Sequence, residues 1–144
     1  MTFHRFAILL VVSLLTSETM AAGYPKIVDG VAVLDSEVEK YVRPAFDDDD
    51  GRPLRSVVVD LNGDGVPEKF VPNEFMCGQG GCPWVIYEER FQKVIGHIFG
   101  SSIEVMEVTK NGFHSLEASY STGGAKMDKQ IYEFSGSHYE KASR

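Results

Sequence analysis

The stretch SVVVDLNGDGVPEKFV, residues 56–71, decides the fold. Residues 56–59 are a β-branched run, and an extended apolar pattern resumes at residues 69–71. Between them, residues 60–68 are rich in Asp, Asn and Gly, which favour turns because they tolerate left-handed backbone and hydrogen-bond to nearby amides. The stretch therefore predicts two strands joined by a tight polar turn.

Outward from this stretch, short strand patterns recur along the chain. Further candidates are residues 84–87, 93–98, 103–108, 113–120 and 130–134. Asn111-Gly112 is a strong two-residue hairpin signal, and residues 122–124 and 135–137 are plausible turns. Short strands at fairly regular spacing predict an antiparallel sheet that curls over one core.

One short helix precedes the strands. Ser36 with Glu39 three residues later has the form of a capping box, and Val38 and Val42 give a short apolar stripe. Pro44 is expected to end this helix early. The predicted fold class is α+β, mainly β, with a curled antiparallel sheet and this N-terminal helix packed against it.

The turn itself has the spacing of a calcium loop. Asp60, Asn62 and Asp64 occupy its first, third and fifth places, Val66 would offer a backbone carbonyl, and Glu68 stands ninth. Calcium takes six to eight oxygen ligands, and alternate carboxylate and amide side chains on a tightly curled backbone supply them. The sequence therefore predicts a calcium-binding turn with a structural role. The alternative is a metal-free acidic turn.

The turn is not a complete EF-hand. Val71 stands at the twelfth place, where an EF-hand has a bidentate Glu, and no long helix-forming stretch flanks the loop. Over residues 57–71 it resembles the calcium turns of FG-GAP and VCBS-type repeats, in which the ninth place carries an acid. This resemblance implies calcium as the bound metal, and it concerns the loop alone, because the propeller of those repeats is too large for this chain.

The N-terminus has the three-part pattern of a secretory signal peptide. Arg5 precedes an apolar run, residues 6–15, and a stretch of small residues ends at Ala21 and Ala22. We expect a signal peptide over residues 1–22 and a single β-rich domain over residues 23–144, located in the periplasm or secreted. The apolar run is shorter than the roughly 20 residues that span a bilayer, so the mature chain is expected to have no transmembrane segment.

Charge limits the classes of partner. The formal net charge of −7 argues against nucleic acid, whose phosphates need a basic surface, and permits a basic protein or a cation. The acidic run at residues 47–50 is expected to be a solvated loop, and the alternative is a contact for a basic partner.

Both cysteines lie in CGQGGC, residues 77–82. In the oxidising compartment that a signal peptide implies, Cys77 and Cys82 are expected to form a disulfide that fixes the shape of this glycine-rich loop. So short a ring would contribute about 2 kcal/mol through chain entropy.

No catalytic motif stands out in the sequence. His97, His114 and His138 are far apart, and the adjacent Glu88 and Glu89 would point to opposite faces of a strand. We therefore expect a non-enzymatic protein that acts by binding.

Two regions are candidate partner-binding sites. Trp84, beside the disulfide loop, is a candidate anchor, with core packing as the alternative. The segment containing Ser135, Gly136 and Tyr139 resembles the SGxxY loop that some periplasmic lysozyme inhibitors insert into the enzyme cleft. The alternative for this segment is a plain terminal hairpin. The loops at residues 76–84 and 123–127 could also plug an enzyme groove.

These features resemble the inhibitors and immunity proteins that bacteria export against cell-wall-degrading enzymes, including type VI amidases. The resemblance implies a hydrolase or effector as protein partner. The alternative is a calcium-dependent carbohydrate- or surface-binding module, which would need coplanar exposed aromatics from among Tyr87, Tyr120, Tyr132 and Tyr139.

Overall fold

The computed structural model describes residues 26–27 and 30–143. The predicted signal peptide, residues 1–22, lies outside these described residues. Within them, no helix is both long enough and apolar enough to cross a membrane.

The secondary structure is mostly strand. The elements are β1 (Lys26–Ile27), β2 (Ala32–Val33), α1 (Ser36–Val42), η1 (Arg43–Ala45), β3 (Arg55–Val59), β4 (Glu68–Pro72), η2 (Glu74–Met76), β5 (Cys82–Glu88), β6 (Lys93–Gly100), β7 (Ser102–Lys110), β8 (Phe113–Gly123), β9 (Lys126–Phe134) and β10 (Tyr139–Lys141). The predicted α+β, mainly β class is confirmed.

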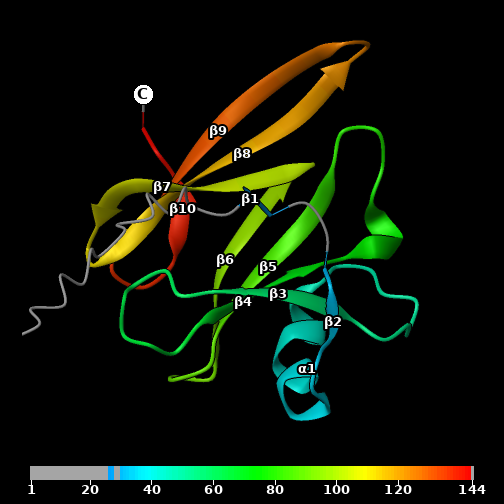
Figure 1. The fold of residues 1–144 in the computed structure, drawn as a ribbon. Coiled ribbons are helices and arrows are strands. Elements are labelled where there is room, and N and C mark those ends of the chain that lie inside the picture. The colour runs from blue at the N-terminus through cyan, green and yellow to red at the C-terminus, as the bar shows by residue number, and fades with distance from the viewer. Residues whose placement is uncertain (1–25, 28–29, 144) are drawn as a thin grey trace, which may run out of the picture.

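Two antiparallel sheets make up the described part of the chain, where the sequence predicted one curled sheet. Their strand orders are β1-β7-β8-β9-β10 and β2-β3-β4-β5-β6. The two sheets come close where β6 approaches β8 and β10. Figure 1 shows α1 beside the sheet that contains β3 and β4, away from the long β8–β9 hairpin.

The main core lies between the sheets. Phe70, Trp84 and Ile86 from one sheet pack with residues such as Ile103 and Leu116 from the other. This burial arises from the strand alternation, which places apolar side chains on the facing sides of the two sheets. It also leaves the opposite face of the β3–β6 sheet free for the helix.

A second, smaller core lies between α1 and that opposite face. Val38 and Val42 pack in a cluster with Val71 and Val85. The helix ends at Val42 before the proline-containing η1, as predicted. Its N-cap differs from the prediction.

Asp35, rather than Ser36, caps the helix. The Asp35 side chain accepts a hydrogen bond from Glu37 N at 2.8 Å, and Ser36 is already the first helical residue. Both residue types are good N-caps and they are adjacent, so the sequence pattern could not separate them.

The predicted hairpin turn at Asn111-Gly112 is confirmed. Asn111 and Gly112 have φ of 51° and 84° and connect β7 to β8. The next hairpin, β8–β9, is much longer and extends away from the body of the molecule (Figure 1).

Candidate functional site

The predicted calcium turn connects β3 to β4. Its backbone is curled by two glycines with positive φ, Gly63 at 73° and Gly65 at 83°. The Asp60 carboxylate accepts hydrogen bonds from the backbone amides of both glycines, at 2.8 and 3.0 Å. This first acid therefore organises the curl of the turn.

The next two side chains follow the same pattern. Asn62 Oδ1 accepts a bond from Asp64 N at 3.0 Å, and Asp64 Oδ1 accepts one from Val66 N at 2.8 Å. Arg90 lies 3.3 Å from the other carboxylate oxygen of Asp64. These contacts lower the pKa of Asp64, chiefly through the Val66 amide, so this side chain is held ionised.

Glu68 begins β4 and is fully buried. Its Oε2 accepts a hydrogen bond from Leu61 N at 2.7 Å, and its Oε1 lies 3.5 Å from Asn62 Nδ2. Burial raises the pKa of Glu68 to about 7, and the negative charges of Asp60 and Asp64 add to the rise. The turn therefore holds the buried Glu68 carboxyl close to the side chains of Asp60 and Asp64.

The structure brings the predicted side chains Asp60, Asn62, Asp64 and Glu68 onto one turn. Their donor atoms are oxygens, the class that calcium prefers. No cluster of three or more His, Cys, Asp or Glu side chains with metal-binding geometry occurs among residues 26–27 and 30–143. The calcium assignment thus stays a prediction, and it needs the amide of Asn62 and the carbonyl of Val66 in addition to the acids.

The turn also connects the two sheets. Leu61 is buried in the main core, and its carbonyl accepts a hydrogen bond from His114 N, in β8, at 2.8 Å. The His114 carbonyl in turn accepts a bond from the Tyr139 hydroxyl at 2.7 Å. A continuous path of hydrogen bonds therefore runs from Glu68 through Leu61 to the C-terminal strand of the other sheet.

The disulfide between Cys77 and Cys82 is present, as predicted. Inside its loop, Gly78 and Gly81 exchange backbone hydrogen bonds of 2.9 and 3.1 Å, and Gly80 O accepts one from Ser121 N in β8 at 3.1 Å. Any Cβ at Gly81 would lie 2.4 Å from the Gly100 carbonyl carbon. The loop is therefore packed closely against the sheets, and only glycine fits at position 81.

Trp84 lies in the main core, so its environment is the core packing that was the alternative to an exposed anchor. Its side chain is 1% exposed, and its indole N–H donates to Gly100 O at 2.9 Å. Trp84 therefore offers almost no surface to a partner in this structure. An aromatic residue next to a loop fits either environment, and only the strand register decides which side it faces.

The SGxxY segment is the turn between β9 and β10. Ser135 and Gly136 are exposed, as a contact loop requires. Tyr139 instead packs against Phe113 and Phe134 in the core, and its hydroxyl donates a hydrogen bond to the backbone carbonyl of His114. Tyr139 therefore offers no surface to a partner, and the segment has the form of a terminal hairpin.

Sequence reasoning missed several exposed aromatic residues, and Phe99 is the one beside the disulfide loop. Phe99, in β6, is 44% exposed and forms an edge-to-face pair with Tyr120, their ring centroids 6.4 Å apart. In β6 the side chain of Ile98 points into the core and that of Phe99 points to solvent. Strand alternation predicts that neighbouring residues face opposite sides, but the sequence does not say which side of β6 is buried.

No family model matches the chain, and no curated protein or solved structure resembles it at a significant level.

Proposed function

We propose that this protein is an exported, non-enzymatic binding protein that inhibits a cell-wall-degrading enzyme, as an inhibitor or immunity protein does. The observation that carries the proposal is a group of large apolar side chains exposed around the disulfide loop. We call it the disulfide-loop face and define it by Met76, Phe99 and Met127, which are 44%, 44% and 52% exposed.

These three side chains are linked through the disulfide loop and the hollow beside it. Met76 and Phe99 line the same hollow. Met127 pairs across the β8–β9 hairpin with Ser121, whose amide donates to Gly80 in the disulfide loop. Exposed apolar side chains gathered on one face are typical of interaction sites, and aromatic and Met anchors contribute much of the binding energy there.

The face is also rigid, which favours binding. The disulfide closes the loop, the Gly78–Gly81 bonds fix its tip, and the bond to Ser121 fixes it against β8. A preorganised loop loses little conformational entropy when it enters an enzyme groove. The net charge of −7 would speed association with a basic hydrolase.

The alternative, a carbohydrate-binding module, receives less support. Of the tyrosines proposed for a flat aromatic platform, Tyr87, Tyr132 and Tyr139 are buried, and Tyr120 is engaged with Phe99. The described tyrosines therefore do not provide a row of exposed rings on which sugars could stack.

Calcium would act as a clamp in this proposal. Asp60, Asn62, Asp64 and Glu68, with the Val66 carbonyl, would hold the ion, and its charge would offset the repulsion at the buried carboxylate. With an affinity near 10⁻⁴ M and about 1 mM calcium, binding would stabilise the fold by about 1.4 kcal/mol. Because the turn hydrogen-bonds to His114, this stabilisation reaches both sheets.

The proposal is tested by inhibition assays on purified cell-wall hydrolases. A muramidase and an amidase are each mixed with the protein, and the clearing of a peptidoglycan suspension is followed. We expect stoichiometric inhibition of one of them, and loss of inhibition in Met76→Asp and Phe99→Asp.

Val108→Asp is the matched control. Val108 is also exposed, at 61%, but it lies near the far end of β7, about 20 Å along the strand from Ser102 and the disulfide loop. If Val108→Asp abolishes inhibition as thoroughly as Met76→Asp, or if neither class of hydrolase is inhibited, the proposal is wrong.

A further inference from the structure

A hollow of about 310 Å³ lies beside the disulfide-loop face. It is open to solvent and is lined by the end of η1, the base of the disulfide loop, strands β5 and β6, and the β9–β10 pair. Its volume is at the lower end of the range of about 300–1,000 Å³ found for ligand pockets, so it suits a small ligand.

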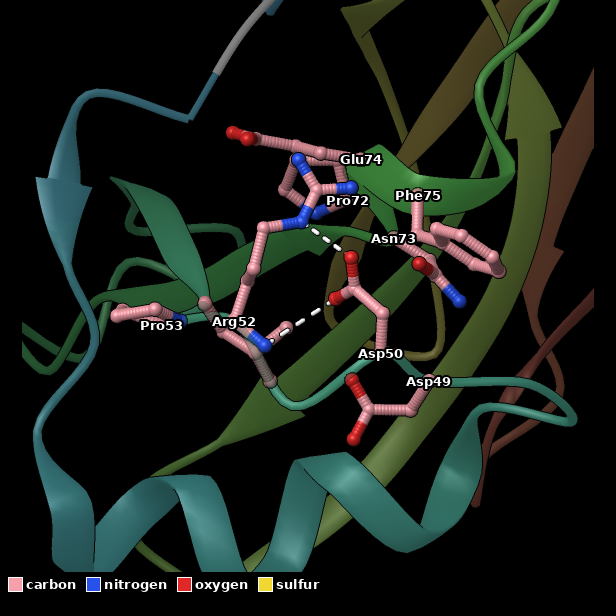
Figure 2. A pocket seen from close by; sticks show the side chains of 9 residues that line it. Asp49, Asp50, Arg52, Pro53, Pro72, Asn73, Glu74 and Phe75 are labelled. Carbon is pink, nitrogen blue, oxygen red and sulfur yellow. Dashed lines mark hydrogen bonds and ion pairs between the residues drawn. The ribbon is translucent and has the colours of Figure 1, made fainter.

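Two other hollows are less suitable. The pocket in Figure 2, between the acidic loop and η2, has about 20 Å³, enough for a single water molecule. Its Asp50 carboxylate already pairs with the Arg52 side chain and backbone amide (Figure 2). A third pocket, beside α1, has about 320 Å³, but its lysines Lys40 and Lys69 are paired with acids of the same pocket.

The 310 Å³ hollow has an apolar lining. Phe46, Met76, Pro83, Val85 and Phe99 contribute to it, from four separate elements or loops. Such a lining favours a ligand with apolar side chains, since both surfaces leave water on binding.

Two opposite charges also line this hollow without a partner. Asp47 lies on the η1 side and Lys141 on the β10 side, and neither makes an ion pair with any described residue. By contrast, the nearby Asp49 is paired with Arg43. The hollow therefore has the Asp47 carboxylate and the Lys141 ammonium available for a ligand, and His97 also belongs to its lining.

The acidic rim is held in place by the protein. Asn73 donates through its side chain to Asp48 O at 2.6 Å and through its backbone amide to Pro83 O at 2.9 Å. Asn73 thus links the loop that carries Asp47 to the floor of the hollow in β5. The rim is preorganised, so a ligand need not order this loop on binding.

Because the hollow combines an apolar lining with the opposite charges of Asp47 and Lys141, we propose that it binds a short peptide with free termini and apolar side chains. The peptide's ammonium group lies against Asp47, its carboxylate lies against Lys141, and its side chains contact Met76 and Phe99. This activity goes beyond the inhibition of an enzyme, because it requires no protein partner.

The test is a calorimetric titration of the protein with three probes: the dipeptide Leu-Leu, its N-acetyl derivative and its C-terminal amide. We expect Leu-Leu to bind most tightly. An exposed ion pair is worth up to about 1 kcal/mol, so Asp47→Asn should weaken Leu-Leu about fivefold and leave the N-acetyl derivative unchanged. Lys141→Gln should weaken Leu-Leu by a similar factor and leave the amide unchanged.

Asp48→Asn is the matched control, because Asp48 is the adjacent acid and does not line the hollow. It should bind Leu-Leu as the wild type does. The proposal is overturned if wild-type protein shows no binding of Leu-Leu at millimolar concentration, or if Asp48→Asn weakens it as much as Asp47→Asn. Because no hydrolase is present, a failure here is separate from a failure of the proposed inhibition.

Discussion

Replacing Glu68 with Gln should remove the loss of stability that a rising pH causes in the calcium-free protein. Glu68 is buried, and its pKa rises from the ordinary 4.5 to about 7 on folding. The folded state therefore holds this proton more tightly than the unfolded chain does. The resulting stability is fully present below pH 4.5 and is lost as the pH rises through 7.

The size of the effect follows from the pKa difference. One pKa unit corresponds to about 1.4 kcal/mol, so the rise to about 7 amounts to about 3 kcal/mol between pH 4.5 and pH 8. In Glu68→Gln the neutral amide keeps the shape of the side chain and removes the charge. We expect the variant to match the wild type near pH 5 and to be more stable than it at pH 8.

Urea denaturation in chelator and in 1 mM calcium measures the pH dependence of stability and the effect of calcium on it. Calcium binds the ionised carboxylate, so it should flatten the pH dependence of the wild type and leave Glu68→Gln unaffected. The reasoning is refuted if wild type and Glu68→Gln lose stability equally between pH 5 and pH 8 in chelator.

Three further variants test local parts of the fold by denaturant unfolding. Removing the disulfide as Cys77→Ser with Cys82→Ser should cost about 2 kcal/mol and leave the sheets folded, and a loss of all near-ultraviolet circular dichroism would contradict this. Gly81→Ala should cost about 3 kcal/mol, because its Cβ would meet the Gly100 carbonyl carbon and its φ is 136°; no measurable loss would show that the loop can shift. Asp35→Ala should cost about 1 kcal/mol through the lost N-cap. An equal loss of stability in Ser36→Ala would contradict the assignment of the cap to Asp35.

Local signals in the sequence predicted the local structure well. The β-branched run before Asp60, the positive-φ turn at Asn111-Gly112 and the proline that follows α1 each act over a few residues. The disulfide was predictable for the same reason, because Cys77 and Cys82 are joined by a short loop of glycines. These features depend little on the rest of the fold.

The division into two sheets was not predictable, because it depends on pairings between distant segments. β1 pairs with β7, far along the chain, and no local pattern specifies that partner. The burial of Trp84 and Tyr139 depends on the same arrangement. Both are amphipathic aromatics whose polar atoms, once buried, find backbone carbonyls at Gly100 and His114.

The role of the polar turn also became clear only from the tertiary structure. The sequence predicted a calcium-binding turn with a structural role. In the structure the turn is bonded to β8 of the other sheet, through Leu61 and His114. Its buried Glu68 lies at the start of this path, which explains how a surface loop can affect the whole fold.

The central claim is that calcium bound in the turn clamps the two sheets together. Hydrogen exchange at the His114 amide tests it most directly, because that amide donates to the Leu61 carbonyl in the turn. Exchange is measured by nuclear magnetic resonance in chelator and in 1 mM calcium. A stabilisation of about 1.4 kcal/mol predicts that exchange slows about tenfold when calcium is present. An exchange rate at His114 that is the same in calcium and in chelator would contradict the claim that calcium clamps the two sheets together.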